Sequence, residues 1–109
     1  MDSVEKAFIK KAYSVSEWLK EWHGSKELAI KSGKICEAFN LQKEGLRKIV
    51  NFLRSSGIPI CSGKRGYWYS ENPEDIRETL LHLEGRVQGI NRAIKGLKVI
   101  QENTGEIES

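Results

Sequence analysis

The chain has 109 residues and a net charge of +3, with 39% hydrophobic and 30% charged residues. This length is that of one domain with a modest core, and this balance excludes the disordered, collagen-like and disulfide-scaffold classes. No uncharged apolar run approaches the roughly 18 residues that span a bilayer, and the start lacks a signal region, so we expect a cytoplasmic protein. Cys36 and Cys61 lack the spacing of a zinc site, so we interpret both as small buried hydrophobic residues and expect no metal and no cofactor.

Residues 1–24 are predicted to be helical, because apolar residues recur at alternating spacings of four and three. These residues are Phe8, Ala12, Val15, Leu19 and Trp22. Capping-box patterns begin at Asp2 and again at Ser14, so one helix and two helices both fit the segment. Gly24 ends it.

The winged part is predicted to begin at residue 25. Residues 27–31 fit either a last helical turn or a brief strand. Ser32 is then an N-cap candidate for a short helix over 33–39, whose apolar side is Ile35, Ala38 and Phe39. Asn40 tolerates the left-handed conformation that a tight turn between helices requires.

A second helix is predicted from Gln42 to about Ser55. Its apolar face is Leu46, Ile49, Val50 and Leu53, while its polar side is basic. Gly57 ends this helix. Residues 58–61 and 67–69 are rich in strand formers, and the segment 62–66 between them contains two glycines, so a β-hairpin is expected.

A long helix is predicted from Asn72 to about residue 102, since an Asn cap precedes Pro73 and two acids. Its apolar residues repeat every four and three positions. We expect Ile76, Leu80 and in part Leu83 to pack on the domain, and residues 104–109 to be a flexible tail. The remaining stripe needs a partner, either a second copy in a parallel homodimer or the apolar stripe of residues 8–22. The expected dimerisation residues are Leu83, Val87, Ile90, Ile94 and Leu97.

Positive charge is concentrated in the middle of the chain. Residues 40–70 hold six basic residues and one acid, Glu44, whereas residues 71–109 hold five basic residues and eight acids. Two helices joined by a tight turn, the second basic and followed by a basic-tipped hairpin, form an arrangement that fits the major groove and the backbone of duplex DNA. The sequence therefore predicts a mainly α fold with a small β-hairpin wing, a winged helix-turn-helix followed by a long C-terminal helix.

The segments 35–42, 46–54, 57–60 and 66–69 resemble the winged helix-turn-helix of the biotin-operon-repressor type. Their arrangement is also similar to that of small regulatory proteins encoded by phages and prophages. The most specific piece is the wing, Gly-Ile-Pro-Ile followed by Gly-Tyr. The resemblance implies DNA contacts from the 42–55 helix and the wing, and Arg54 lies on the same basic side of that helix. The expected DNA-binding residues are Gln42, Lys43, Arg47, Lys48, Asn51, Arg54, Lys64 and Arg65.

The resulting hypothesis is a sequence-specific regulator of transcription or replication that binds double-stranded DNA. The alternative is a winged-helix module that docks on proteins without binding DNA. We expect no enzymatic activity and no small-molecule substrate, because the chain lacks a Gly-rich phosphate loop and a nucleophile elbow. The acids Glu74, Asp75 and Glu78 are interpreted as helix-capping charges.

Overall fold

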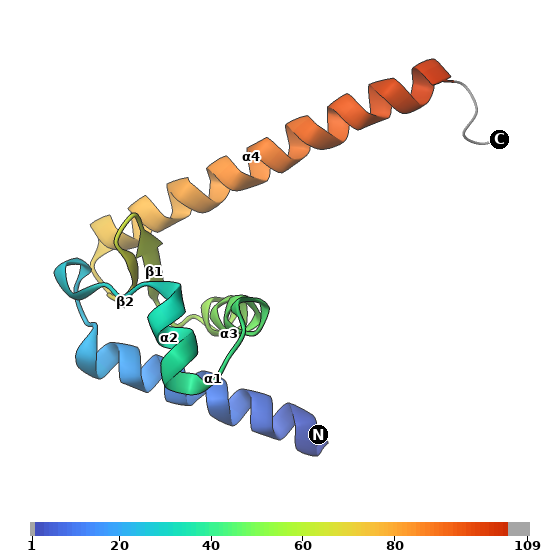
Figure 1. Ribbon diagram of the computed structural model, residues 1–109. Coiled ribbons are helices and arrows are strands. Elements are labelled where there is room, and N and C mark those ends of the chain that lie inside the picture. The colour runs from blue at the N-terminus through green and yellow to red at the C-terminus, as the bar shows by residue number, and fades with distance from the viewer. Residues whose placement is uncertain (1, 105–109) are drawn as a thin grey trace. The chain divides into compact units, whose positions relative to one another are not determined.

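Residues 2–104 are described by a computed structural model, and within that range the chain is mainly helical with one antiparallel hairpin, as predicted (Figure 1). The chain divides into two units, residues 1–79 and residues 80–109. Each unit is described by itself below. The predicted tail lies outside the described residues except for Thr104, which is the last helical residue.

Helix α1 (Ser3–Trp22) is a single continuous helix, so the one-helix interpretation is correct. The Asp2 carboxylate accepts a hydrogen bond from the Glu5 N–H at 2.7 Å, which caps the first turn as predicted. The Ser14 hydroxyl instead donates to the Lys10 carbonyl oxygen at 3.0 Å in the middle of the helix. Trp22 is 60% exposed, so it is not part of the buried stripe.

Residues 26–31 combine the two structures that the sequence left open. Residues Lys26–Leu28 form the 3₁₀ helix η1, and Ile30 then makes an antiparallel bridge to Tyr67. Helix α2 (Ser32–Phe39) follows. The prediction that Ser32 caps this helix is wrong, because Ser32 is its first helical residue and Lys31 takes the cap position.

The turn after α2 is left-handed, as predicted. Asn40 has φ of 52°, which lets the Leu41 N–H donate to the Cys36 carbonyl oxygen at 2.9 Å. The buried face of α2 is shifted from the predicted one: Ile35 is buried and Phe39 half-buried, but Ala38 is exposed. Cys36, half-buried, takes the place expected for Ala38.

Helix α3 (Lys43–Ser55) ends in a Schellman motif. The Ile58 N–H donates to the Leu53 carbonyl oxygen and the Gly57 N–H to the Arg54 carbonyl oxygen. Gly57 has φ of 85°, a conformation that glycine adopts without steric cost, so the predicted glycine stop is confirmed.

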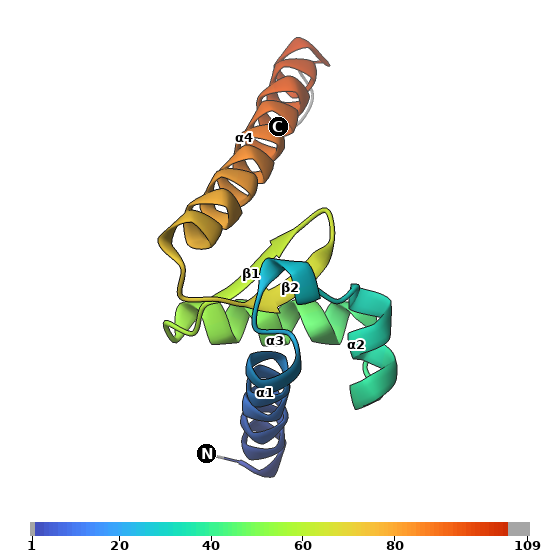
Figure 2. The same ribbon diagram turned by 90° about the vertical axis from the view of Figure 1, so that its left-hand side faces the viewer.

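The hairpin consists of β1 (Ile60–Gly63) and β2 (Gly66–Tyr69). Its register pairs Ile60 with Tyr69 and Gly63 with Gly66. The loop is therefore only Lys64–Arg65, shorter than the expected five-residue turn, and the first strand begins two residues later than predicted. The hairpin tip points away from α1 in both views (Figures 1 and 2).

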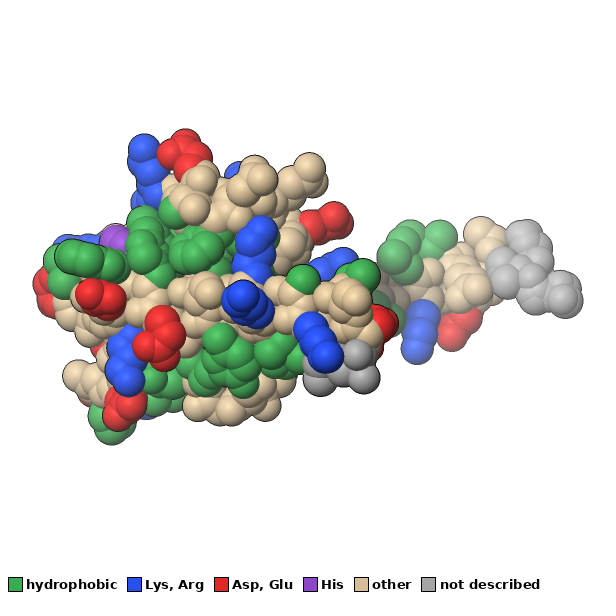
Figure 3. Space-filling view, turned by 90° about the horizontal axis from the view of Figure 1, so that it is seen from below, with side chains coloured by type: hydrophobic (Ala, Val, Ile, Leu, Met, Phe, Trp, Pro, Cys, Tyr) green, Lys and Arg blue, Asp and Glu red, His purple; other side chains and the backbone are tan. Residues whose placement is uncertain are grey.

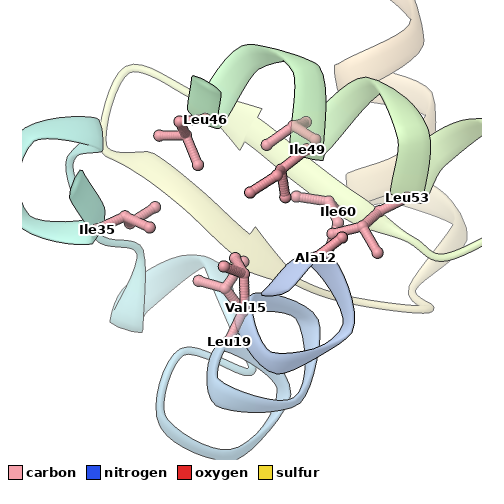
Figure 4. Packing of buried hydrophobic residues seen from close by; sticks show 9 residues of the cluster. Ala12, Val15, Leu19, Ile35, Leu46, Ile49, Leu53 and Ile60 are labelled. Carbon is pink, nitrogen blue, oxygen red and sulfur yellow. The ribbon is translucent and has the colours of Figure 1, made fainter. Parts of the chain in front are cut away.

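The core of the first unit lies between α1, α3 and the hairpin. From α1, the fully buried residues are Ala12, Val15 and Leu19. They face the buried side of α3, and Ile35 and Ile60 close the cluster (Figure 4). Burying this apolar surface supplies most of the favourable free energy of folding. The polar side of α3 is consequently left outward.

Helix α4 (Pro73–Thr104) begins as predicted, with the Asn72 side-chain oxygen accepting from the Glu74 N–H at 2.9 Å. Asp75 does more than complement the helix end. One of its carboxylate oxygens accepts from the Trp68 indole N–H at 3.1 Å and from the Ser70 hydroxyl at 2.7 Å. The buried Thr79 hydroxyl, one turn further on, accepts from the Ser62 N–H at 3.2 Å. The first two turns of α4 are thus part of the first unit, residues 1–79, which contains the hairpin.

The second unit contains the rest of α4, from Leu80 to Thr104. Leu80, which was expected to pack on the domain, is 52% exposed in the single chain. Leu83 is half-buried. No helix within residues 2–104 is long and apolar enough to span a membrane.

Candidate nucleic-acid interface

The outward side of α3 carries the predicted recognition residues. Because Leu46, Ile49, Val50 and Leu53 are at most 3% exposed, the helical period turns the polar residues between them to solvent. Those exposed side chains are Lys43, Arg47, Lys48 and Asn51, with Gln42 exposed at the N-cap position. Glu44 is the acid on this surface. The helix therefore presents three cations, one acid and two amides.

Arg54 is placed differently from the other predicted contacts. It is half-buried, its Nε donates to the Ile60 carbonyl oxygen at 2.7 Å, and its Nη2 donates to the Ser62 hydroxyl at 3.0 Å. These charge-assisted bonds join the last turn of α3 to β1. The placement of Arg54 gives it a structural role, which the pattern of basic residues in the sequence does not reveal.

The wing tip consists of Lys64 and Arg65, both exposed as predicted. Its backbone is braced from another element: the Lys31 ammonium group donates to the Lys64 carbonyl oxygen at 2.6 Å. The backbone at Gly66 is also in close contact with the segment before α2. The next residue, Tyr67, exchanges two backbone hydrogen bonds with Ile30, at 2.8 and 2.9 Å. The tip is therefore held at its base.

Lys26 and Lys31 are basic residues of this surface that the sequence did not single out. They lie more than thirty positions before the wing tip in sequence, and the bridge between Ile30 and Tyr67 helps to bring the two segments together. Lys26 lines an open surface depression of about 440 Å³ together with Glu27, Lys64, Arg65 and Glu78. We call this feature the wing depression.

An ion pair crosses the wing depression. The Lys26 ammonium group lies 2.8 Å from a carboxylate oxygen of Glu78, and both side chains are between 40 and 50% exposed. The hydrogen bond that the Lys26 ammonium group donates to Glu78 raises the pKa of Lys26, so Lys26 is charged near neutral pH. The depression thus combines three cations with two acids.

The face of the molecule that carries α1 has a different charge pattern. Figure 3 shows acidic and basic side chains interspersed with hydrophobic ones on this face. Helix α1 itself contains four lysines and three glutamates. Opposite charges so close together give no extended positive field for a polyanion, so the basic surface is that of α3 and the wing.

The side chains of His23 and Cys61 are both held within the folded unit. Among the described residues there is no group of three side chains that could hold a metal ion. The His23 ring is hydrogen-bonded through Nδ1 to the Leu28 carbonyl oxygen at 2.7 Å and packs on Trp18. Cys61 is buried as predicted, and burial raises the pKa of its thiol, whereas Cys36 is only half-buried.

The predicted dimerisation residues form a stripe on α4. Leu83 is half-buried, whereas Val87, Ile90, Ile94 and Leu97 are 44–67% exposed in the single chain. The competing partner, the apolar stripe of α1, is already occupied: Ala12, Val15 and Leu19 are completely buried by other elements of the first unit. Of that stripe, only Trp22 is largely exposed, at 60%, and Phe8 is half-buried.

Comparison of the chain with family models, with curated proteins and with solved structures gave no match. The likeness to the winged helix of the biotin-operon-repressor type therefore depends on the residues quoted above and on the order of the elements.

Proposed function

We propose that the protein is a sequence-specific regulator that binds double-stranded DNA through α3 and the wing and catalyses no reaction. One observation supports this proposal most strongly. The outward residues of α3 and the exposed tip Lys64–Arg65 belong to one folded unit, in which the helices, the Ile30 bridge and the hairpin follow one another in the order of a winged helix.

The outward residues of α3 have the chemistry for two kinds of DNA contact. The amide of Asn51 can bond bidentately to adenine and the guanidinium group of Arg47 to guanine, which gives sequence preference. Lys43 and Lys48 suit phosphate groups, and so do Lys64 and Arg65 on the wing. Arg54 is left out of this set because its guanidinium group holds β1.

A second copy of the chain is the proposed partner of α4. The β-branched residues Val87 and Ile94 alternate with Leu83 and Leu97 at heptad positions, a pattern that favours a parallel two-stranded coiled coil. A two-fold dimer would contact two half-sites about 34–36 Å apart, or a multiple of this distance, on a roughly palindromic site. Regulation of transcription or of replication, in a phage or prophage setting and in the cytoplasm, is consistent with such a protein.

The test is a binding titration of the full chain against genomic DNA fragments at two salt concentrations. Specific binding should weaken steeply with salt, because each phosphate contact releases counterions. Arg47→Gln and Asn51→Ala should change the preferred sequence, whereas Lys64→Gln should weaken binding to all sequences alike. Lys10→Gln on α1, which removes the same charge elsewhere, is the matched control and should have little effect.

If the native protein binds no DNA even at about 50 mM salt, the proposal is wrong. The winged unit is then better interpreted as a protein-docking module.

A further inference from the structure

The wing depression contains more positive charge than the wing itself supplies. Lys64 and Arg65 come from the hairpin loop, but Lys26 comes from η1, and all three line the same hollow. The hydrogen bond to Glu78 raises the pKa of Lys26 most strongly, and the positive charge of Arg65 opposes this shift to a smaller extent. The same hollow is lined by two acids, Glu27 and Glu78, so the three cations leave one positive charge in excess, which favours an added anion.

Glu78 occupies part of the place that such an anion would take. Its carboxylate lies 2.8 Å from the Lys26 ammonium group and beside Gly63, the last residue of β1 before the wing loop. Both partners are partly exposed, so their pairing is weak enough to exchange for another anion. Glu78 is also fixed in position, because the adjacent Thr79 and the nearby Asp75 anchor this turn of α4 to the hairpin.

We propose that the wing depression is a binding site for a backbone phosphate of DNA, and that Glu78 competes with this phosphate for Lys26 in the free protein. The cations that line the depression, Lys26, Lys64 and Arg65, would bind the phosphate. When the phosphate enters, Lys26 exchanges Glu78 for it. The carboxylate of Glu78 thereby lowers the affinity for any DNA sequence, because the exchange must precede the contact. This inference rests on the proposed DNA-binding function.

Replacing Glu78 tests the competition directly. Glu78→Gln should raise the affinity for DNA of any sequence by roughly two- to fivefold, the range expected for one exposed ion pair. The matched control is Glu74→Gln, one turn earlier on α4, where the carboxylate lies 3.9 Å from Arg77 and outside the depression. The control removes the same negative charge and should raise the DNA affinity only slightly.

A double-mutant cycle separates competition for Lys26 from general repulsion. Lys26→Gln should weaken binding and reduce the dependence of log affinity on log salt by about one unit. In the Lys26→Gln background, Glu78→Gln should give no further gain. If Glu78→Gln raises the affinity equally with and without Lys26, the competition is refuted.

The outcomes also separate this inference from the proposed function. Sequence-specific binding by the native chain, with Glu78→Gln equal to Glu74→Gln, refutes the depression as a phosphate site but leaves the function standing. Absence of DNA binding refutes both. A titration of the native protein with inorganic phosphate, followed by amide NMR shifts at Lys26 and Arg65, distinguishes the two possible phosphate sources: shifts with free phosphate and no DNA affinity mean a small-anion site and overturn the proposal.

Discussion

Gly66 is the residue whose identity the fold constrains most closely. Its φ of 119° is a conformation that side-chain-bearing residues rarely adopt. A Cβ atom there would collide with the carbonyl group of Ile30, at the point where Ile30 pairs with Tyr67. The glycine thus allows the segment before α2 to lie against the wing, and this contact brings Lys26 and Lys31 to the wing.

Replacing Gly66 should therefore damage the fold. We expect Gly66→Ala to lower the free energy of unfolding by about 1–3 kcal/mol, measured by urea denaturation, because of backbone strain. Gly33→Ala is the control, since a Cβ at Gly33 in α2 meets open space. That variant should be more stable by up to about 1 kcal/mol. Equal stability of the two variants would contradict the close contact.

Two arginines of α3, seven positions apart, are expected to behave in opposite ways. Arg54→Gln should lower the free energy of unfolding by about 1–3 kcal/mol, because it removes the charged bonds to Ile60 and Ser62. Arg47→Gln, at an exposed position, should leave stability within about 0.5 kcal/mol and weaken DNA binding. Thermal unfolding and a DNA titration of both variants check this. A loss of stability in Arg47→Gln larger than in Arg54→Gln would reverse the assignment.

At the scale of elements, α3 has the two faces that the proposed function needs, one apolar and buried and one basic and exposed. Its buried face joins α1 and the hairpin, and this packing leaves the basic side outward. Its end at Gly57 then directs the chain into β1, so α3 and the wing are positioned by the same short segment. On α4 beyond Thr79, the apolar residues Val87, Ile90, Ile94 and Leu97 are 44–67% exposed in the single chain.

The stripe on α4 leads to a prediction about oligomeric state. Ile94→Glu should convert the dimer into a monomer, because a charge at this core position of a coiled coil would be buried without a partner. Gln88→Glu adds the same charge off the stripe and should leave the dimer intact. Sedimentation at high micromolar concentration distinguishes the two. A monomeric native protein under these conditions would refute the homodimer.

At the scale of the whole molecule, dimerisation and DNA binding should be coupled. A dimer that holds two winged units together turns the second half-site contact into an intramolecular step, which raises affinity by roughly 10²–10⁴-fold. Ile94→Glu should lose that factor on a two-half-site duplex, while Gln88→Glu keeps it. Titration of both variants on duplexes with one and with two half-sites gives the measurement. Equal affinity of Ile94→Glu and native protein for the two-half-site duplex would separate dimerisation from DNA binding.

Much of this protein follows from its sequence by local rules. Helical periodicity gave the buried faces of α1 and α3, Asp2 and Asn72 gave two helix starts, and Gly57 gave a helix end. These features depend on neighbouring residues, so a pattern of three- and four-residue spacings predicts them. The mainly α fold with a hairpin wing follows from their order.

The tertiary structure decided what depends on residues far apart in the chain. The two-residue wing loop and the later start of β1 are set by strand register, which local composition specifies weakly. The bonds of Arg54 to β1, of Asp75 to Trp68 and of Lys26 to Glu78 join elements that come together only when the core forms. Sequence alone therefore determined the winged unit and its basic helix, whereas folding decided which of the charged side chains face solvent and which hold the wing.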